Sequence, residues 1–285
     1  MGKQKIGNSD NLIKNVSYLS RSDKIRLKKA LAFCNSAHLG QFRRTGDPYS
    51  SHPIEVANIC ASWHLDVEAL IAALLHDTVE DTSTSLLKIS SNFGGTVTEL
   101  VDGLSKIDKL VFKSYEEETA ENFRKMLLAT AADVRVILIK LADRLHNMTT
   151  LSALSPEKKR RISKETLEIF APIAYRLGFN ELFRKLEELC FRNLFPIRYK
   201  VLHNAMQTAK GNRKELILEL KTKINKKLPQ FGIKGKVFGR EKTLYSIYLK
   251  MKEKKLSFAE VLDIYGFRII VRSLNECYLA LGAVH

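Results

Sequence analysis

The stretch LLHDTVEDT, at residues 74–82, places four ionisable side chains in an otherwise apolar, alanine-rich segment. If the segment is helical, His76 and Glu80 share one face because they are four residues apart, and Asp77 and Asp81 share the adjoining face. Burying such groups is costly unless they are paired with other charges or bound to a metal. The density of these groups therefore favours a functional site over ordinary core residues.

Two further clusters carry side chains suited to the same chemistry. In LADRLHNMTTL, Asp143 follows an apolar run and lies in line with Asn147 and Thr150 on a predicted helix. In RRTGDPYSSHP, His52 stands at the predicted start of another helix. Two imidazoles and two carboxylates form a mixed nitrogen and oxygen set suited to a divalent transition metal such as Mn, Fe, Co or Zn. The predicted ligands are His52, His76, Asp77 and Asp143.

Each of these residues alone has a simpler interpretation. A histidine before a proline, as at His52, is more often a capping or surface residue. Asp143 followed by Arg144 is most simply an ion pair on a helix surface, which contributes under about 1 kcal/mol. The order of the motifs, H, then HD, then D on separate predicted helices, favours the metal site. The other histidines lack this context and are interpreted as structural or exposed: His38, His64, His146, His203 and His285.

The elements that must position these residues are predicted to be helices from Ser22 to about residue 210. DVEALIAALLHD shows apolar residues at i, i+3, i+4 and i+7 spacing, with Asp66 as its predicted N-cap. Small residues in this segment (Ala69, Ala72 and Ala73) would let neighbouring helices approach closely. Gly178 is a predicted helix stop.

The pattern changes after Gly211. IKGKVFGR and DIYGFRIIV are predicted strands, and LYSIYLKMKEKKL and NECYLALGAVH are predicted helices. Because two strands make a poor independent core, residues 201–285 are predicted to be the opening part of a second domain. The predicted fold is mainly α: a tail over 1–20, an all-helical domain over 21–200 and an incomplete α+β segment over 201–285.

Composition places the chain among globular proteins, with 45% hydrophobic and 27% charged residues in 285. No apolar run approaches the ~18 residues of a membrane span, and the N-terminus shows no signal core. The four scattered cysteines are interpreted as unpaired thiols in a reducing compartment. These features predict a cytoplasmic protein with no membrane partner, and they do not indicate its oligomeric state.

The net charge of +16 is unevenly distributed. Residues 201–285 hold 17 Lys and Arg against 7 Asp and Glu. Such a segment attracts nucleotides or RNA, although a solvated lysine-rich helix face explains single lysines equally well. No motif indicates contact with nucleic acid or the ribosome.

Longer strings make the sequence recognisable. RRTGDPYSSHPIEVA, ALLHDTVEDT, LVDGLSKI and IKLADRLHNM resemble the hydrolase domain of the RelA/SpoT homologues, within the HD superfamily of metal-dependent phosphohydrolases. GREKTLYSIYLKMKEKKLSFAEVLDIYGFRIIV resembles the start of that family's synthetase domain. The resemblance covers roughly residues 20–285. It implies a cytoplasmic enzyme of the stringent response that hydrolyses (p)ppGpp to GDP or GTP and pyrophosphate.

The resemblance also implies roles for individual residues. The family's Mn²⁺ ligands fall on the four predicted ligands, and its water-activating pair falls on Glu80 and Asp81. Both motifs are intact here, which favours an active hydrolase. Thr45 where serine is common, and Asp47 where glutamate is common, are mild departures. The family's nucleotide contacts fall on Arg43, Arg44, Thr45, Asn147 and Thr150.

For synthesis, the resemblance places Arg240 and Lys242 near ATP and Asp263 as a Mg²⁺ ligand. The family's second carboxylate and its G-Y-Q-S stretch lie beyond residue 285, so no synthetase activity, and no Mg²⁺ site, is expected of these residues alone. The alternatives are a pyrophosphokinase making (p)ppGpp, a non-catalytic regulatory or RNA-binding HD module, and an HD nucleotidase with another substrate.

Overall fold

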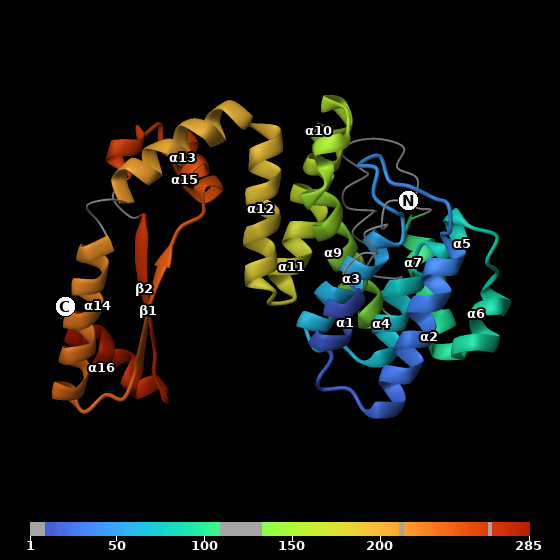
Figure 1. The fold of residues 1–285 in the computed structure, drawn as a ribbon. Coiled ribbons are helices and arrows are strands. Elements are labelled where there is room, and N and C mark those ends of the chain that lie inside the picture. Colours follow the sequence, from blue (N-terminus) through green and yellow to red (C-terminus); the bar gives the residue numbers. More distant parts are fainter. Residues whose placement is uncertain (1–8, 109–132, 211–213, 262–263) are drawn as a thin grey trace. The chain divides into compact units, whose positions relative to one another are not determined.

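The computed structural model describes residues 9–108, 133–210, 214–261 and 264–285 (Figure 1). The chain divides into two compact units, Met1–Cys190 and Phe191–His285. The sequence predicted the change near residue 200, whereas the division falls inside helix α12 (Asn180–Leu194). Phe191 explains the earlier division, because its fully buried ring stacks on Tyr248 of the second unit at 5.0 Å between ring centroids.

The regular structure of the first unit's described residues is helical, as predicted, apart from an isolated bridge between Phe42 and Pro48. Its helix α4 packs against four other helices, α2, α3, α7 and α9. The helices of its described residues are α1 (Ser9–Asn15), α2 (Arg21–Ala37), α3 (Ser51–Ser62), α4 (Val67–Leu75), α5 (Thr78–Asp81), α6 (Leu86–Phe93), α7 (Gly95–Asp108), α9 (Val134–Thr149), α10 (Pro156–Glu165), α11 (Ala171–Arg176) and α12. A 3-10 turn (Leu151–Ala153) and a π-helical turn (Thr166–Phe170) flank α10.

Helix α4 starts where the sequence predicted, because the Asp66 side chain accepts a hydrogen bond from the Ala69 backbone N–H at 2.9 Å. Its alanines are fully buried, as close packing of the neighbouring helices requires. The helix does not run on to Asp81, however. It ends at Leu75, and the Thr78 hydroxyl donates to the Leu75 carbonyl at 2.6 Å, where a helical backbone bond would otherwise form.

The N-terminal segment 1–20, predicted as a tail, contains helix α1. Leu12 and Val16 are completely buried, and the Tyr18 hydroxyl donates to the Leu65 carbonyl at 2.8 Å. Leu12 and Val16 therefore belong to the first unit's core. Among the residues that the structure describes, no helix is both long and apolar enough to cross a lipid bilayer.

The second unit combines helices with a two-stranded antiparallel sheet, which confirms the predicted α+β pattern. Strand β1 (Lys236–Glu241) pairs with β2 (Tyr265–Ile270), from Lys236 opposite Ile270 to Glu241 opposite Tyr265. Two small apolar clusters form its core. The helices are α13 (Pro196–Lys210), α14 (Lys214–Lys227), α15 (Leu244–Lys254) and α16 (Leu274–Val284), with 3-10 turns at Leu228–Phe231 and Phe258–Glu260.

Glu187 of α12 gives the first unit a pH-dependent stability. Burial, followed by the neighbouring Glu188, raises the pKa of the Glu187 carboxyl from 4.5 to about 7. The folded chain therefore binds this proton more tightly than the unfolded chain, and the free energy of unfolding falls as pH rises from about 4.5 to 7. Thermal denaturation measured at pH 5 and at pH 8 should show a smaller loss of stability between the two pH values for Glu187→Gln than for the wild type. Glu157→Gln, on the exposed first turn of α10, is the control. Equal losses in all three proteins would contradict the prediction.

Candidate metal and nucleotide site

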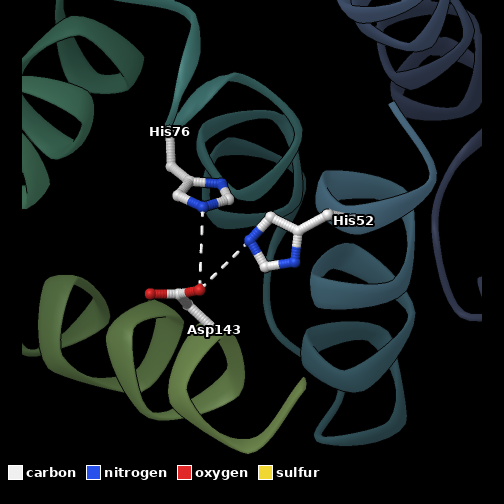
Figure 2. A group of neighbouring side chains, drawn as sticks. All are labelled: His52, His76 and Asp143. Atoms are coloured by element: carbon white, nitrogen blue, oxygen red, sulfur yellow. Dashed lines mark ion pairs between the residues drawn. The ribbon is translucent and has the colours of Figure 1, made fainter. Parts of the chain in front are cut away.

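Three side chains predicted as metal ligands meet inside the first unit, each brought by a different helix. His52 lies in the first turn of α3, His76 directly follows α4, and Asp143 lies in the middle of α9. All three are buried, although they are far apart in the sequence. One potential ligand atom from each lies within 4.8 Å of the others (Figure 2). The arrangement suits a single metal ion.

The distances between the ligand atoms are compatible with a single metal ion. His52 Nε2 lies 3.1 Å from Asp143 Oδ1, and His76 Nε2 lies 4.0 Å from the same oxygen. Figure 2 shows both rings turned toward the carboxylate. Nitrogen and oxygen ligands lie about 2.1 Å from a bound Zn²⁺, so two ligands of one ion of this size are separated by at most about 4.2 Å.

Asp77, the fourth predicted ligand, lies at the edge of this group. Its Oδ1 is 2.9 Å from His76 Nε2, and its Oδ2 is 3.6 Å from His52 Nε2. The compact group contains His52, His76 and Asp143 without it, and Asp77 is more exposed than those three. Asp77 contacts the two histidines through different oxygens, so its carboxylate faces the compact group with both of its acceptors.

The hydrogen bonds of His76 leave one of its ring nitrogens able to bind a cation. Its Nδ1 lies 2.9 Å from the Ala73 carbonyl, which can only accept, so this nitrogen carries the ring proton in the neutral imidazole. Nε2 then points a lone pair toward carboxylate oxygens, and it is buried without a hydrogen bond among the described residues. A lone pair facing anionic oxygens is stable only when a proton or a metal ion lies between them.

The charges of the cluster also favour a bound proton or metal ion. Burial alone would lower the pKa of His76, but Asp77 and Asp143 outweigh burial and raise it to about 9. Burial would raise the pKa of both carboxyls. The histidines instead hold the pKa of Asp77 below its usual value, and Lys140 with His52 does so for Asp143. The site therefore keeps its carboxylates ionised and attracts positive charge.

Two residues around the ligands were missed by the sequence interpretation. His146, taken there as structural or exposed, lies with its Nδ1 2.7 Å from His52 Nδ1. Burial, then His52 and Arg43, lower its pKa to about 3, so it is neutral at pH 7. Buried Lys140 places its Nζ 2.9 Å from Asp143 Oδ2. Both lie three residues from Asp143, and that spacing was the available signal.

A cavity of about 470 Å³ adjoins the metal group, with Asp143 in its lining. Arg43 Nη2 donates to Asn147 Oδ1 at 3.3 Å, and Asn147 Nδ2 donates to Asp143 Oδ1 at 2.6 Å. These bonds connect the loop that contains Arg43 and Arg44, called here the arginine-rich loop, to the predicted metal ligand Asp143. The cavity brings together all five predicted nucleotide contacts: Arg43, Arg44, Thr45, Asn147 and Thr150.

The predicted water-handling residues, Glu80 and Asp81, are exposed on the short helix α5. Asp81 Oδ2 accepts a hydrogen bond from the Tyr49 hydroxyl, which also lies 3.0 Å from Asp77 Oδ2. Burial, followed by Asp77, raises the pKa of Tyr49 above its usual value, so the hydroxyl stays protonated. Tyr49 was not singled out in the sequence, because nothing in its spacing links it to the HD motif.

The predicted synthetase residues lie in the second unit. Arg240 is on β1, where its backbone pairs with Gly266. Lys242 lines a separate cavity of about 620 Å³, together with the basic residues Lys250 and Arg268. Asp263 lies outside the described residues.

Helical architecture and a buried His, His, Asp group define the class of this protein. Residues 30–180 match the family described as HD domain, and the chain belongs to that family. Residues 239–285 match the region found in RelA/SpoT proteins. The resemblance to the RelA/SpoT homologues is therefore confirmed.

Full-length relatives are much longer than this chain. A guanosine-3′,5′-bis(diphosphate) 3′-pyrophosphohydrolase of Vibrio cholerae is 50% identical over 268 residues, which are 94% of this chain and 38% of the relative. The bifunctional (p)ppGpp synthase/hydrolase SpoT of Escherichia coli K12 is 49% identical, with the same two shares. A GTP pyrophosphokinase of Myxococcus xanthus is 45% identical over 91% of this chain and 35% of the relative.

A metal ion bound at this site should stabilise the folded chain against heat. A ligand that binds only the folded chain adds about 2.7 kcal/mol of stability at a hundred times its dissociation constant. Adding Mn²⁺ to protein stripped with EDTA should therefore raise the melting temperature, and His76→Gln should abolish most of this rise. An equal rise in the variant and the wild type would place the metal elsewhere.

Proposed function

We propose that the chain hydrolyses the 3′-diphosphate of ppGpp or pppGpp, giving GDP or GTP and pyrophosphate. The observation that carries this proposal is the buried group of His52, His76 and Asp143 beside a basic cavity. A metal-ligand set next to two arginines suits an anionic phosphate ester. The names of the Vibrio cholerae and Escherichia coli relatives support the choice of substrate.

In this proposal one Mn²⁺ is held by His52, His76, Asp77 and Asp143. The donor set fits a divalent ion, since it combines two imidazole nitrogens with two carboxylates. When bound, such an ion supplies a Lewis acid for a phosphoryl oxygen and lowers the pKa of water. His146 and Lys140 hold the His52 ring and the Asp143 carboxylate in the orientation that the ion needs.

Glu80 and Asp81 handle the attacking water. Glu80 accepts a proton as water adds to the phosphorus attached to the ribose O3′. The bond between that phosphorus and O3′ breaks, the water oxygen leaves as part of pyrophosphate, and a proton goes to O3′ of the nucleotide. Asp81, tied to Tyr49, orients the water. Both carboxylates are exposed, so they can reach a substrate that enters from solvent.

The arginine-rich loop binds the nucleotide. Arg43 offers a flat guanidinium that stacks on guanine, while Arg44 neutralises phosphate charge. Thr45, Asn147 and Thr150 line the same cavity as the two arginines. The Arg43–Asn147 bond joins the loop that carries the arginines to helix α9.

Product analysis tests the proposal. Purified protein with Mn²⁺ should convert ppGpp to GDP and pyrophosphate in equal amounts, and Asp77→Ala should not. Release of orthophosphate, or equal turnover of other nucleotides, would instead identify an HD nucleotidase of another specificity. Equal pyrophosphate release by Asp77→Ala and wild type would refute the proposal. Salt-sensitive RNA binding without metal-dependent turnover would favour the regulatory module.

A second candidate function is the synthesis of (p)ppGpp from ATP and GDP or GTP. The basic cavity beside Lys242 and the match of residues 239–285 to the RelA/SpoT region favour it. AMP formation from ATP and GDP in the presence of Mg²⁺ would support this activity. Failure to form AMP would leave hydrolysis as the activity of these residues.

A further inference from the structure

The Tyr49 hydroxyl lies between two carboxylates with different proposed roles. It donates a hydrogen bond to Asp81 Oδ2 and lies 3.0 Å from Asp77 Oδ2. Asp77 is a proposed metal ligand, and Asp81 belongs to the pair that handles water. A phenol has one proton, so it can donate fully to only one of the two carboxylates at a time.

The Tyr49 side chain is held rigidly in this position. Its ring stacks on that of buried His38, with 4.7 Å between centroids and 25° between planes. Its backbone N–H donates to the Gln41 carbonyl at 3.0 Å. The Gln41 side chain in turn donates to the Asp81 backbone carbonyl at 2.8 Å. Tyr49 and the end of α5 are therefore tied to the same short loop.

His38 completes the support. Because the Gln41 amide nitrogen is used by Asp81, its Oε1 faces His38, whose Nδ1 lies 2.7 Å away and must donate. A buried ring thus fixes Gln41, and Gln41 fixes both the Tyr49 backbone and the Asp81 carbonyl. This framework holds the Tyr49 side chain next to both carboxylates.

We propose that Tyr49 is a positioning residue that couples metal binding at Asp77 to the orientation of Asp81. The hydroxyl contacts Asp77 Oδ2 and donates to Asp81 Oδ2, so one side chain orients both carboxylates. Loss of the hydroxyl therefore frees Asp77 and Asp81 together. This inference rests on the proposed function for the roles of both carboxylates, but it makes a prediction about metal binding that needs no substrate.

Isothermal titration of Mn²⁺ into the metal-free full chain tests the coupling. Tyr49→Phe keeps the ring that stacks on His38 and removes only the hydroxyl. It should weaken Mn²⁺ binding by about tenfold, as loss of a group that orients a ligand does. Tyr18→Phe removes a hydroxyl that donates to the Leu65 carbonyl and should leave the affinity unchanged. Equal affinities of Tyr49→Phe and the wild type would overturn the proposal, as would a wild type that binds no Mn²⁺.

A double-mutant cycle separates coupling from general loss of structure. Asp81→Asn should change the Mn²⁺ dissociation constant by about threefold more when Tyr49 is present than in the Tyr49→Phe background. Additive effects would show that Tyr49 only supports the loop, and would overturn the coupling. If the wild type binds Mn²⁺ but releases no pyrophosphate from ppGpp, the proposed function fails, while the cycle still decides the role of Tyr49.

Discussion

Replacing Asp143 with asparagine should lower pyrophosphate release from ppGpp by at least about a thousandfold. The ion supplies several kcal/mol of transition-state stabilisation, and each 1.36 kcal/mol corresponds to a factor of ten in rate. Asparagine keeps the shape of the side chain but removes the negative charge that faces His52 and His76. Metal content, measured on the purified variant, should fall together with activity.

The control for this variant is Asp102→Asn. Asp102 pairs with Lys106 on the surface of α7, at 2.6 Å, and such exposed pairs contribute at most about 1 kcal/mol to stability. It should keep both metal and activity. Asp143→Asn protein that is folded, lacks metal and still turns over ppGpp at the wild-type rate would refute a metal-dependent mechanism at this site.

Glu80→Gln is expected to have the second largest effect, on a different step. Removing a general base costs about 10²- to 10⁴-fold in rate, and glutamine cannot accept the proton from water. Because Glu80 lies on α5 outside the compact metal group, Mn²⁺ affinity and KM should stay close to wild type while kcat falls. Steady-state kinetics together with a Mn²⁺ titration measure these quantities.

Glu99→Gln, on the exposed surface of α7, is the matched control and should have wild-type kcat. A Glu80→Gln variant with unchanged kcat would remove Glu80 from the mechanism. A variant that loses metal and activity together would instead make Glu80 part of the metal site.

The spacing of His52, His76 and Asp143 allowed the metal group to be predicted before the structure. Periodicity placed each residue on a separate helix, and the alanines of α4 indicated that these helices pack closely. The structure brings their ligand atoms within 4.8 Å. Their proximity could be anticipated because the helices that carry or precede them were predicted from periodicity. Their role as metal ligands stays a prediction.

Hydrogen bonds of individual side chains explain what periodicity could not predict. Helix α4 ends at Leu75 because the Thr78 hydroxyl competes for its last carbonyl, an effect that periodicity does not record. Tyr49 reaches Asp81 from a loop 32 residues away in the sequence, so no local pattern connects them. His146 lies three residues after Asp143, but only the folded chain shows its contact with His52.

Titrating Mn²⁺ into metal-free protein, while following pyrophosphate release from ppGpp, tests whether hydrolysis depends on a metal ion at this site. Activity should rise from zero in parallel with binding of one ion per chain, and Asp143→Asn should show neither. Pyrophosphate release at the full rate in metal-free protein, or an equal response of Asp143→Asn, would contradict it.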